Sequence, residues 1–233
     1  MAILEIAHAA PTLPPVPSSA TSSSTTAPPP PTQSPILARV DVELWCEVTN
    51  AASLRSQAIA AGTATTTTDA DEPAARSPLR DILFLDADMI ASPLHLRAAL
   101  TRALAAREAG TMRTRTIGTE VTAALSPAST NVAVALTHFG ISDACSNVLA
   151  IRVLSAAQDN DQEEEDVDDL DLARYIHGTR TSLDRLGYSC DVPRLLAAMG
   201  LSSNGATRDF AGMSMRELEL VLVEAIALKG ILT

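Results

Sequence analysis

The stretch DILFLDADMIASPLHLRAALTRALAAREAG, residues 81–110, decides the fold because it predicts a strand followed at once by a capped helix. Its first seven residues are a mainly apolar run of strand length. Ser92 suits the N-cap, Pro93 the first helical position and Gly110 the residue beyond the helix end. One face of the predicted helix carries Leu96, Ala99, Leu100 and Ala103. The stretch therefore predicts a helix packed on a sheet.

Three further strands and five further helices are predicted on either side of this stretch. The strands are the β-branched or alternating runs at residues 3–7, 38–48 and 146–154. The helices lie at residues 52–62, 117–125, 131–140 and 192–200, and the last begins with the capping box Ser214-Met215-Arg216-Glu217. We expect an α/β (α+β) fold in which a small central sheet of about four strands is surrounded by helices, with disordered insertions.

Three polar segments interrupt the predicted elements. Residues 11–36 are dominated by proline, serine and threonine, residues 61–78 form a polar stretch, and residues 157–171 are acidic. Such segments bury too little apolar surface to offset the entropy lost on ordering. A chain of 233 residues suits one sizeable core. We therefore expect a single domain over residues 1–233, with a disordered insertion at 11–36 and loops at 61–78 and 157–171.

Charge and composition narrow the function. The net charge is -11, but nine of the 28 acidic residues lie between Asp159 and Asp171, so the rest of the chain is nearly neutral. Only 3% of residues are aromatic, which disfavours recognition of nucleic acid by base stacking. The start of the chain lacks a basic leader and no apolar run reaches the length of a membrane span. We expect a protein of the nucleus and cytoplasm.

Candidate catalytic or metal-binding motifs are weak. Asp86-Ala87-Asp88 has the DxD form that binds a hard cation, but acids after a strand commonly cap the next element. The four histidines lack metal-ligand spacing, and the three cysteines, at positions 46, 145 and 190, contain no CxxC pair. We predict no catalytic residue, no metal and no cofactor, and keep a DxD-dependent transferase as the alternative.

The chain has one cluster of basic residues, formed by Arg97, Arg102, Arg107, Arg113 and Arg115. Arginine side chains suit phosphate groups because the guanidinium can donate two parallel hydrogen bonds. His95 lies on the same predicted helix face as Arg102. The cluster indicates an anion or phosphate contact, although a solvated surface is the simpler interpretation.

The predicted last helix is apolar on two sides. One stripe contains Leu218, Val221, Ala225 and Leu228, and the other contains Leu220, Val223, Ile226 and Ala227. Two apolar sides need two apolar partners, of which one is the core of the domain. The second is another protein, unless the helix is fully buried.

Two runs of the sequence carry a family signature. These are LDADMIASPLHLRAALTRAL at residues 85–104 and MRTRTIGTEVTAALSPASTNVAVALTHFGISDACSNVLAIRV at residues 112–153. The chain resembles the kinase-binding subunit of the KEOPS (EKC) complex, the family of the PRPK-binding protein. The resemblance extends to EVTNAASLRS at residues 47–56 and to LVEAIALKGIL at residues 222–232. It covers nearly all of the chain outside the three polar segments.

This resemblance implies a subunit without catalytic residues that binds the small atypical kinase of KEOPS. Such a subunit helps to present tRNA to the threonylcarbamoyl-transferase subunit. Family members are also implicated in holding the tRNA 3' CCA end and, in fungi, in telomere maintenance. The alternative within the binding class is a kinase regulator without RNA contact.

On this interpretation we assign residues to two surfaces. The kinase-binding residues are Val223, Ile226, Ala227 and Ile231. The tRNA-binding residues are His95, Arg102, Arg113 and Arg115.

Overall fold

The computed structural model describes residues 2–6, 38–63, 77–126, 131–154, 170–200 and 213–229. Its sheet is antiparallel and has the order β1 (Ala2–Ile6), β2 (Ala38–Cys46), β4 (Val148–Leu154) and β3 (Ile82–Asp86). These are the four predicted strands, which are thereby confirmed. A fifth strand, β5 (Thr179–Thr181), pairs with β2 and was not predicted.

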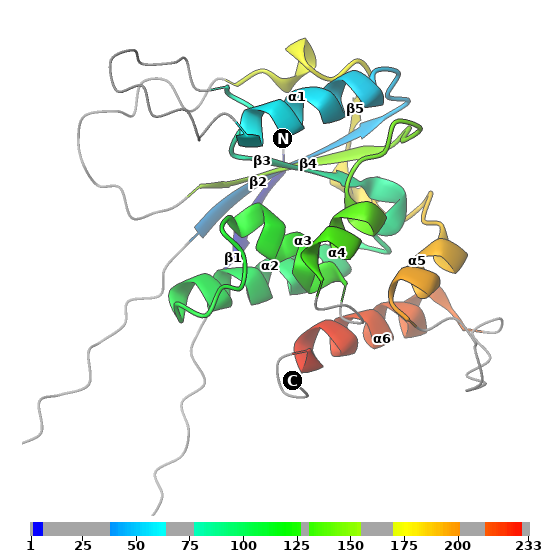
Figure 1. Cartoon of the computed structure of the whole chain (residues 1–233). Coiled ribbons are helices and arrows are strands. Elements are labelled where there is room, and N and C mark those ends of the chain that lie inside the picture. Colours follow the sequence, from blue (N-terminus) through cyan, green and yellow to red (C-terminus); the bar gives the residue numbers. More distant parts are fainter. Residues whose placement is uncertain are drawn as a thin grey trace, which may run out of the picture.

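Helices cover both faces of the sheet (Figure 1). On one face lies α1 (Ala51–Thr63). On the other face lie α2 (Pro93–Glu108), α3 (Ile117–Leu125), α4 (Val132–Phe139), α5 (Val192–Ala198) and α6 (Met215–Leu228). Short 3-10 turns are η1 (Ala87–Met89), η2 (Leu172–Arg174) and η3 (Leu183–Arg185). The expected α/β architecture is therefore confirmed.

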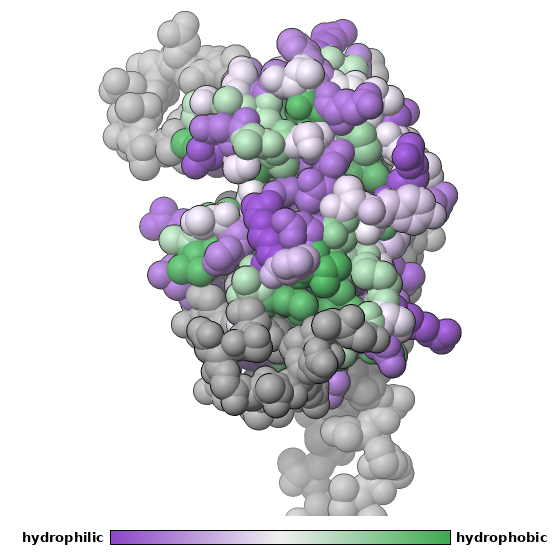
Figure 2. All heavy atoms as spheres, turned by 90° about the vertical axis from the view of Figure 1, so that its right-hand side faces the viewer, coloured by the Kyte–Doolittle hydropathy of each residue, from purple (hydrophilic) through white to green (hydrophobic). Residues whose placement is uncertain are grey.

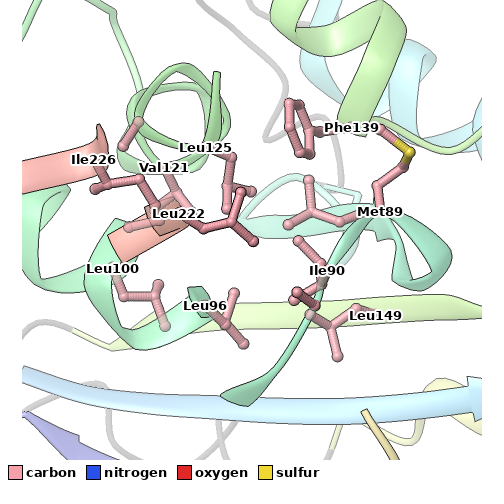
Figure 3. Packing of buried hydrophobic residues seen from close by; sticks show 14 of the residues in the cluster. Met89, Ile90, Leu96, Leu100, Val121, Leu125, Phe139, Leu149, Leu222 and Ile226 are labelled. Atoms are coloured by element: carbon pink, nitrogen blue, oxygen red, sulfur yellow. The ribbon is translucent and has the colours of Figure 1, made fainter. Parts of the chain in front are cut away.

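The strands divide the core into two parts, because successive side chains of a strand point to opposite faces. In the pairing of β2 with β4, Val42 lies opposite Ile151 and Leu44 opposite Leu149, and these side chains join the cluster under α2, α3 and α6. Figure 3 shows this larger cluster. The smaller cluster on the other face contains Trp45 and Phe84 and lies under α1.

The predicted helix ends are confirmed in detail. The Ser92 side chain accepts a 3.0 Å hydrogen bond from the His95 amide, Pro93 begins α2, and Gly110 beyond its end has a φ of 65°. Glycine reaches this left-handed conformation without the steric penalty of a Cβ. Ser214 and Glu217 form the complete capping box of α6. Local sequence thus fixes where these helices begin and end.

The polar segments fall mostly outside the described residues. The predicted insertion at 11–36 lies wholly outside them, as do residues 64–76 and 155–169. Residues 61–63, at the start of the predicted loop and overlapping the predicted helix at 52–62, form the end of α1, and Asp171, at the end of the predicted acidic loop, caps η2. Over the described ranges, no helix has both the length and the apolarity needed to cross a membrane.

Candidate functional site

A group of cations lies where α2, the loop after it and the end of α6 meet. Arg102 on α2 donates hydrogen bonds from Nη1 to the carbonyl oxygens of Ile226, at 2.8 Å, and Ala227, at 3.4 Å. The last carbonyl groups of a helix have no partner within the helix, and they lie at the negative end of its dipole. Arg102, predicted to contact tRNA, therefore caps the C-terminal end of α6.

Lys229, the C-cap residue of α6, has the same role toward α3. Its Nζ donates hydrogen bonds to the carbonyl oxygens of Ala123, at 2.5 Å, and Ser126, at 2.6 Å. The end of α6 is thus held by a cation from α2 and itself supplies a cation to α3. The sequence led us to place Lys229 in a terminal turn that contacts the kinase and did not predict this capping role, although a lysine in the last turn of a helix is a known signal for such contacts.

Glu120 fixes the loop that carries Arg113 and Arg115. One oxygen of its carboxylate, Oε2, accepts hydrogen bonds from the Arg113 amide at 3.1 Å, the Thr114 amide at 3.0 Å and the Thr114 hydroxyl at 2.8 Å. Thr116 caps the start of α3 through a bond from the Thr119 amide. Arg113 and Arg115 are exposed on this fixed loop. Glu120 is the second residue of this site whose role sequence reasoning did not predict.

The cations repel one another. Burial and the charge of Arg113 lower the pKa of Arg102, and Glu120 opposes this effect. Burial, followed by the charges of Arg102 and Arg113, lowers the pKa of Lys229 to about 8, again against the effect of Glu120. We call Arg102, Arg113, Glu120 and Lys229 the basic cluster. Three cations and one carboxylate leave it with a net positive charge, which suits an anion.

His95 does not belong to this cluster. Its side chain is fully buried, its Nδ1 accepts a 3.3 Å hydrogen bond from the Ala91 amide, and burial lowers its pKa to about 4. Because Nδ1 is an acceptor, the ring is neutral and carries its proton on Nε2. The prediction of His95 as a tRNA contact is therefore corrected, since the ring is buried in the first turn of α2.

The rotation of α6 differs from the prediction. Its buried residues are Leu218, Leu222 and Ile226, spaced by four, and Ile226 is only 1% exposed. Figure 3 shows Ile226 and Leu222 beside Val121 of α3 and Leu100 of α2. The assignment of Ile226 to a kinase contact is corrected, because its side chain fills the core of this chain. Ile231 lies outside the described residues.

The outward side of α6 still carries apolar side chains. Leu220 is 59% exposed, Ala227 is exposed and Val223 is half-buried, and all three were predicted for the outer stripe. On the side of the molecule where α5 and the first turns of α6 lie, Figure 2 shows a hydrophobic area with hydrophilic residues above it. We call Leu220, Val223 and Ala227 the α6 stripe.

The DxD motif is engaged within the protein. Asp86 is 2% exposed and forms an ion pair with Arg194, whose Nη1 donates a 2.8 Å hydrogen bond to its carboxylate. It also caps η1 by accepting a hydrogen bond from the Asp88 amide. Asp88 in turn accepts a 2.9 Å bond from the Asn147 side chain. Among the described residues, no group of three or more His, Cys, Asp or Glu side chains could hold a metal ion. The geometry of Asp86 therefore argues for a structural role.

A core-anchored helix with an outward apolar stripe beside a cationic cluster is typical of a binding surface. Residues 45–230 match the family described as kinase binding protein CGI-121, and the chain belongs to this family.

Named relatives agree with this family. The EKC/KEOPS complex subunit cgi121 of Aspergillus fumigatus is 31% identical over 149 residues, which cover 63% of this chain and 74% of the relative. EKC/KEOPS complex subunit CGI121 of Gibberella zeae is 25% identical over 202 residues, covering 84% of this chain and 94% of the relative. The subunit of the same name from Aspergillus terreus is 29% identical over 197 residues, covering 82% and 91%.

Proposed function

We propose that the chain is a non-catalytic subunit of the KEOPS/EKC complex that binds the atypical kinase of the complex through the α6 stripe. The observation that carries this proposal is the α6 stripe itself, three apolar positions on a helix whose opposite side is already buried. The family description supports a kinase as the partner, and the names of the fungal relatives support membership of the EKC/KEOPS complex. The subunit would act in the nucleus and cytoplasm.

The second part of the proposal is contact with the 3' end of tRNA through the basic cluster. Its net positive charge favours phosphate groups, and Arg113 and Arg115 are exposed on the loop that Glu120 holds. Through both contacts the subunit supports threonylcarbamoyladenosine modification of tRNA by the transferase subunit. A role in telomere maintenance follows if the same complex acts there.

One observation favours the alternative of a kinase regulator without RNA contact. Two of the three cations of the basic cluster, Arg102 and Lys229, already bind backbone carbonyl groups of this chain. The RNA contact therefore depends on donor groups that capping leaves available.

Two experiments test the proposal. The purified chain, used as bait, should co-purify with the kinase and, through it, with the transferase subunit. Binding of the chain to tRNA with and without the terminal CCA, at several salt concentrations, tests the RNA contact. Capture of the kinase without any tRNA affinity would favour the alternative, and failure to capture the kinase would reject the main proposal.

A further inference from the structure

The end of α6 and the basic cluster are one physical unit. Arg102 belongs to the cluster and also caps the carbonyl groups of Ile226 and Ala227. Lys229 belongs to the cluster and is also the C-cap residue of α6. We therefore expect a structural change at the end of α6 to affect the basic cluster, and the reverse.

The capping hydrogen bonds use only some of the donor groups of Arg102, and the others can bind an anion. Both capping bonds start from one nitrogen, Nη1, and a guanidinium has donors on two further nitrogens. The guanidinium is planar, so the capping bonds fix the plane in which the remaining donors lie. Holding a donor in position before the ligand arrives reduces the entropy lost on binding.

We propose that anion binding at the basic cluster and ordering of the last turn of α6 are positively coupled through Arg102 and Lys229. This inference rests on the proposed contact with the phosphate groups of a tRNA 3' end, and it adds a regulation of that site. A partner bound to the α6 stripe would then order the last turn of α6 and so strengthen RNA binding. By linkage, bound RNA would strengthen the docking of that partner.

The proposed positive sign of the coupling comes from relief of the repulsion between the cations. The charges of Arg102, Arg113 and Lys229 oppose one another at the place where two of them cap helix ends. A bound phosphate attracts all three cations and offsets their repulsion, which favours the positions in which two of them cap helix ends. Repulsion between the phosphate and the negative ends of these helices acts in the opposite direction. The coupling would have the opposite sign if repulsion between the phosphate and the end of α6 outweighed this effect, or if the phosphate pulled Arg102 away from the carbonyl oxygen of Ile226.

Hydrogen exchange on the full chain tests this coupling without the kinase. The probe is a synthetic RNA hairpin that ends in single-stranded CCA, added at low salt. We expect the amides in the last turn of α6 to exchange more slowly when the RNA is bound. Amides in α1, on the opposite face of the sheet, serve as the internal reference.

A substitution on the α6 side tests the reverse direction. Ala227→Gly loosens the last turn without removing a polar group, and we expect it to weaken RNA affinity by about threefold, within the helix penalty of glycine. Ala60→Gly near the end of α1 is the matched control, because Ala60 is also an exposed helical alanine, and it should leave RNA affinity unchanged.

The outcomes separate the two proposals. RNA binding with slower exchange in α6 and a specific effect of Ala227→Gly supports the coupling. RNA binding with unchanged exchange, and equal affinities for the two glycine variants, overturns the coupling but leaves the RNA contact intact. No RNA binding at low salt overturns the RNA contact and this inference together.

Discussion

Arg102 on α2 donates a 2.8 Å hydrogen bond from Nη1 to the carbonyl oxygen of Ile226 on α6, a residue 124 positions further along the chain. The same residue of α6 packs its side chain against α2 and α3 (Figure 3). Backbone and side chain of Ile226 are therefore both fixed, the first by a cation and the second by apolar contacts. This arrangement sets the rotation of α6 and hence the residues that its outer side presents.

Arg102→Met should lower the free energy of unfolding by about 1 kcal/mol, because the charged donor to the end of α6 is lost while the apolar stem is kept. The effect is smaller than is usual for a charged donor because Arg102 is only partly buried. Urea denaturation measures it. Arg97→Met is the matched control on the exposed side of α2, and an equal loss in both variants would contradict the capping role.

A pair of glutamate substitutions distinguishes the two sides of α6. Ile226→Glu places a carboxylate in the core, so we expect the isolated chain to lose more than about 3 kcal/mol of stability and to melt at a much lower temperature. Leu220→Glu lies on the exposed α6 stripe and should change the stability by no more than about 0.5 kcal/mol. Thermal melting of the two free variants checks both expectations.

Leu220→Glu should nevertheless weaken kinase binding by about tenfold or more, because the apolar contact is replaced by a charge that loses its hydration at the interface. Calorimetry or surface plasmon resonance with the purified kinase measures the affinity. Ile59→Glu on α1 is the matched control, since Ile59 is 56% exposed and α1 covers the opposite face of the sheet. If Leu220→Glu binds as tightly as Ile59→Glu, the kinase docks elsewhere.

The rotation of α6 could not be predicted from its sequence because apolar residues occupy both sides of the helix. The residues that are buried, Leu218, Leu222 and Ile226, have helical spacing. The stripe that was predicted to be buried, which runs through Val221 and Ala225, has helical spacing too. The choice depends on the cations of α2 and of the helix end, Arg102 and Lys229, which bind carbonyl groups far away in the sequence. Period alone contains no information about such contacts.

Elements with local signals were predicted well. The caps at Ser92 and Ser214 depend on residues within one turn and were read correctly. Strand β5, by contrast, has three polar residues, Thr179–Thr181, and exists through its pairing with β2. The burial of His95 was missed for a similar reason, because one histidine in a first turn gives no sign of what packs over it.

The Asp86 carboxylate should prove structural. Asp86→Ala leaves the Asp88 amide and Arg194 without their acceptor, so we expect a loss of about 2 kcal/mol in the free energy of unfolding. Addition of EDTA to the wild type should leave the melting temperature unchanged. A fall in melting temperature with EDTA that Asp86→Ala abolishes would instead reveal a metal at this motif.

His95 should make the stability of the protein depend on pH. Burial lowers its pKa from the ordinary 6.5 to about 4 in the folded state, so between these values the unfolded chain binds a proton that the folded chain does not. Stability is then fully present above pH 6.5 and falls as the pH drops toward 4, by up to about 3 kcal/mol.

The control is His95→Asn, whose amide oxygen can accept the hydrogen bond from the Ala91 amide but does not titrate. Urea denaturation of both proteins at several pH values from 7 to 4 gives the difference in slope. Other groups contribute equally to both slopes, so parallel curves would mean that the histidine is protonated in the fold and that the first turn of α2 opens to solvent.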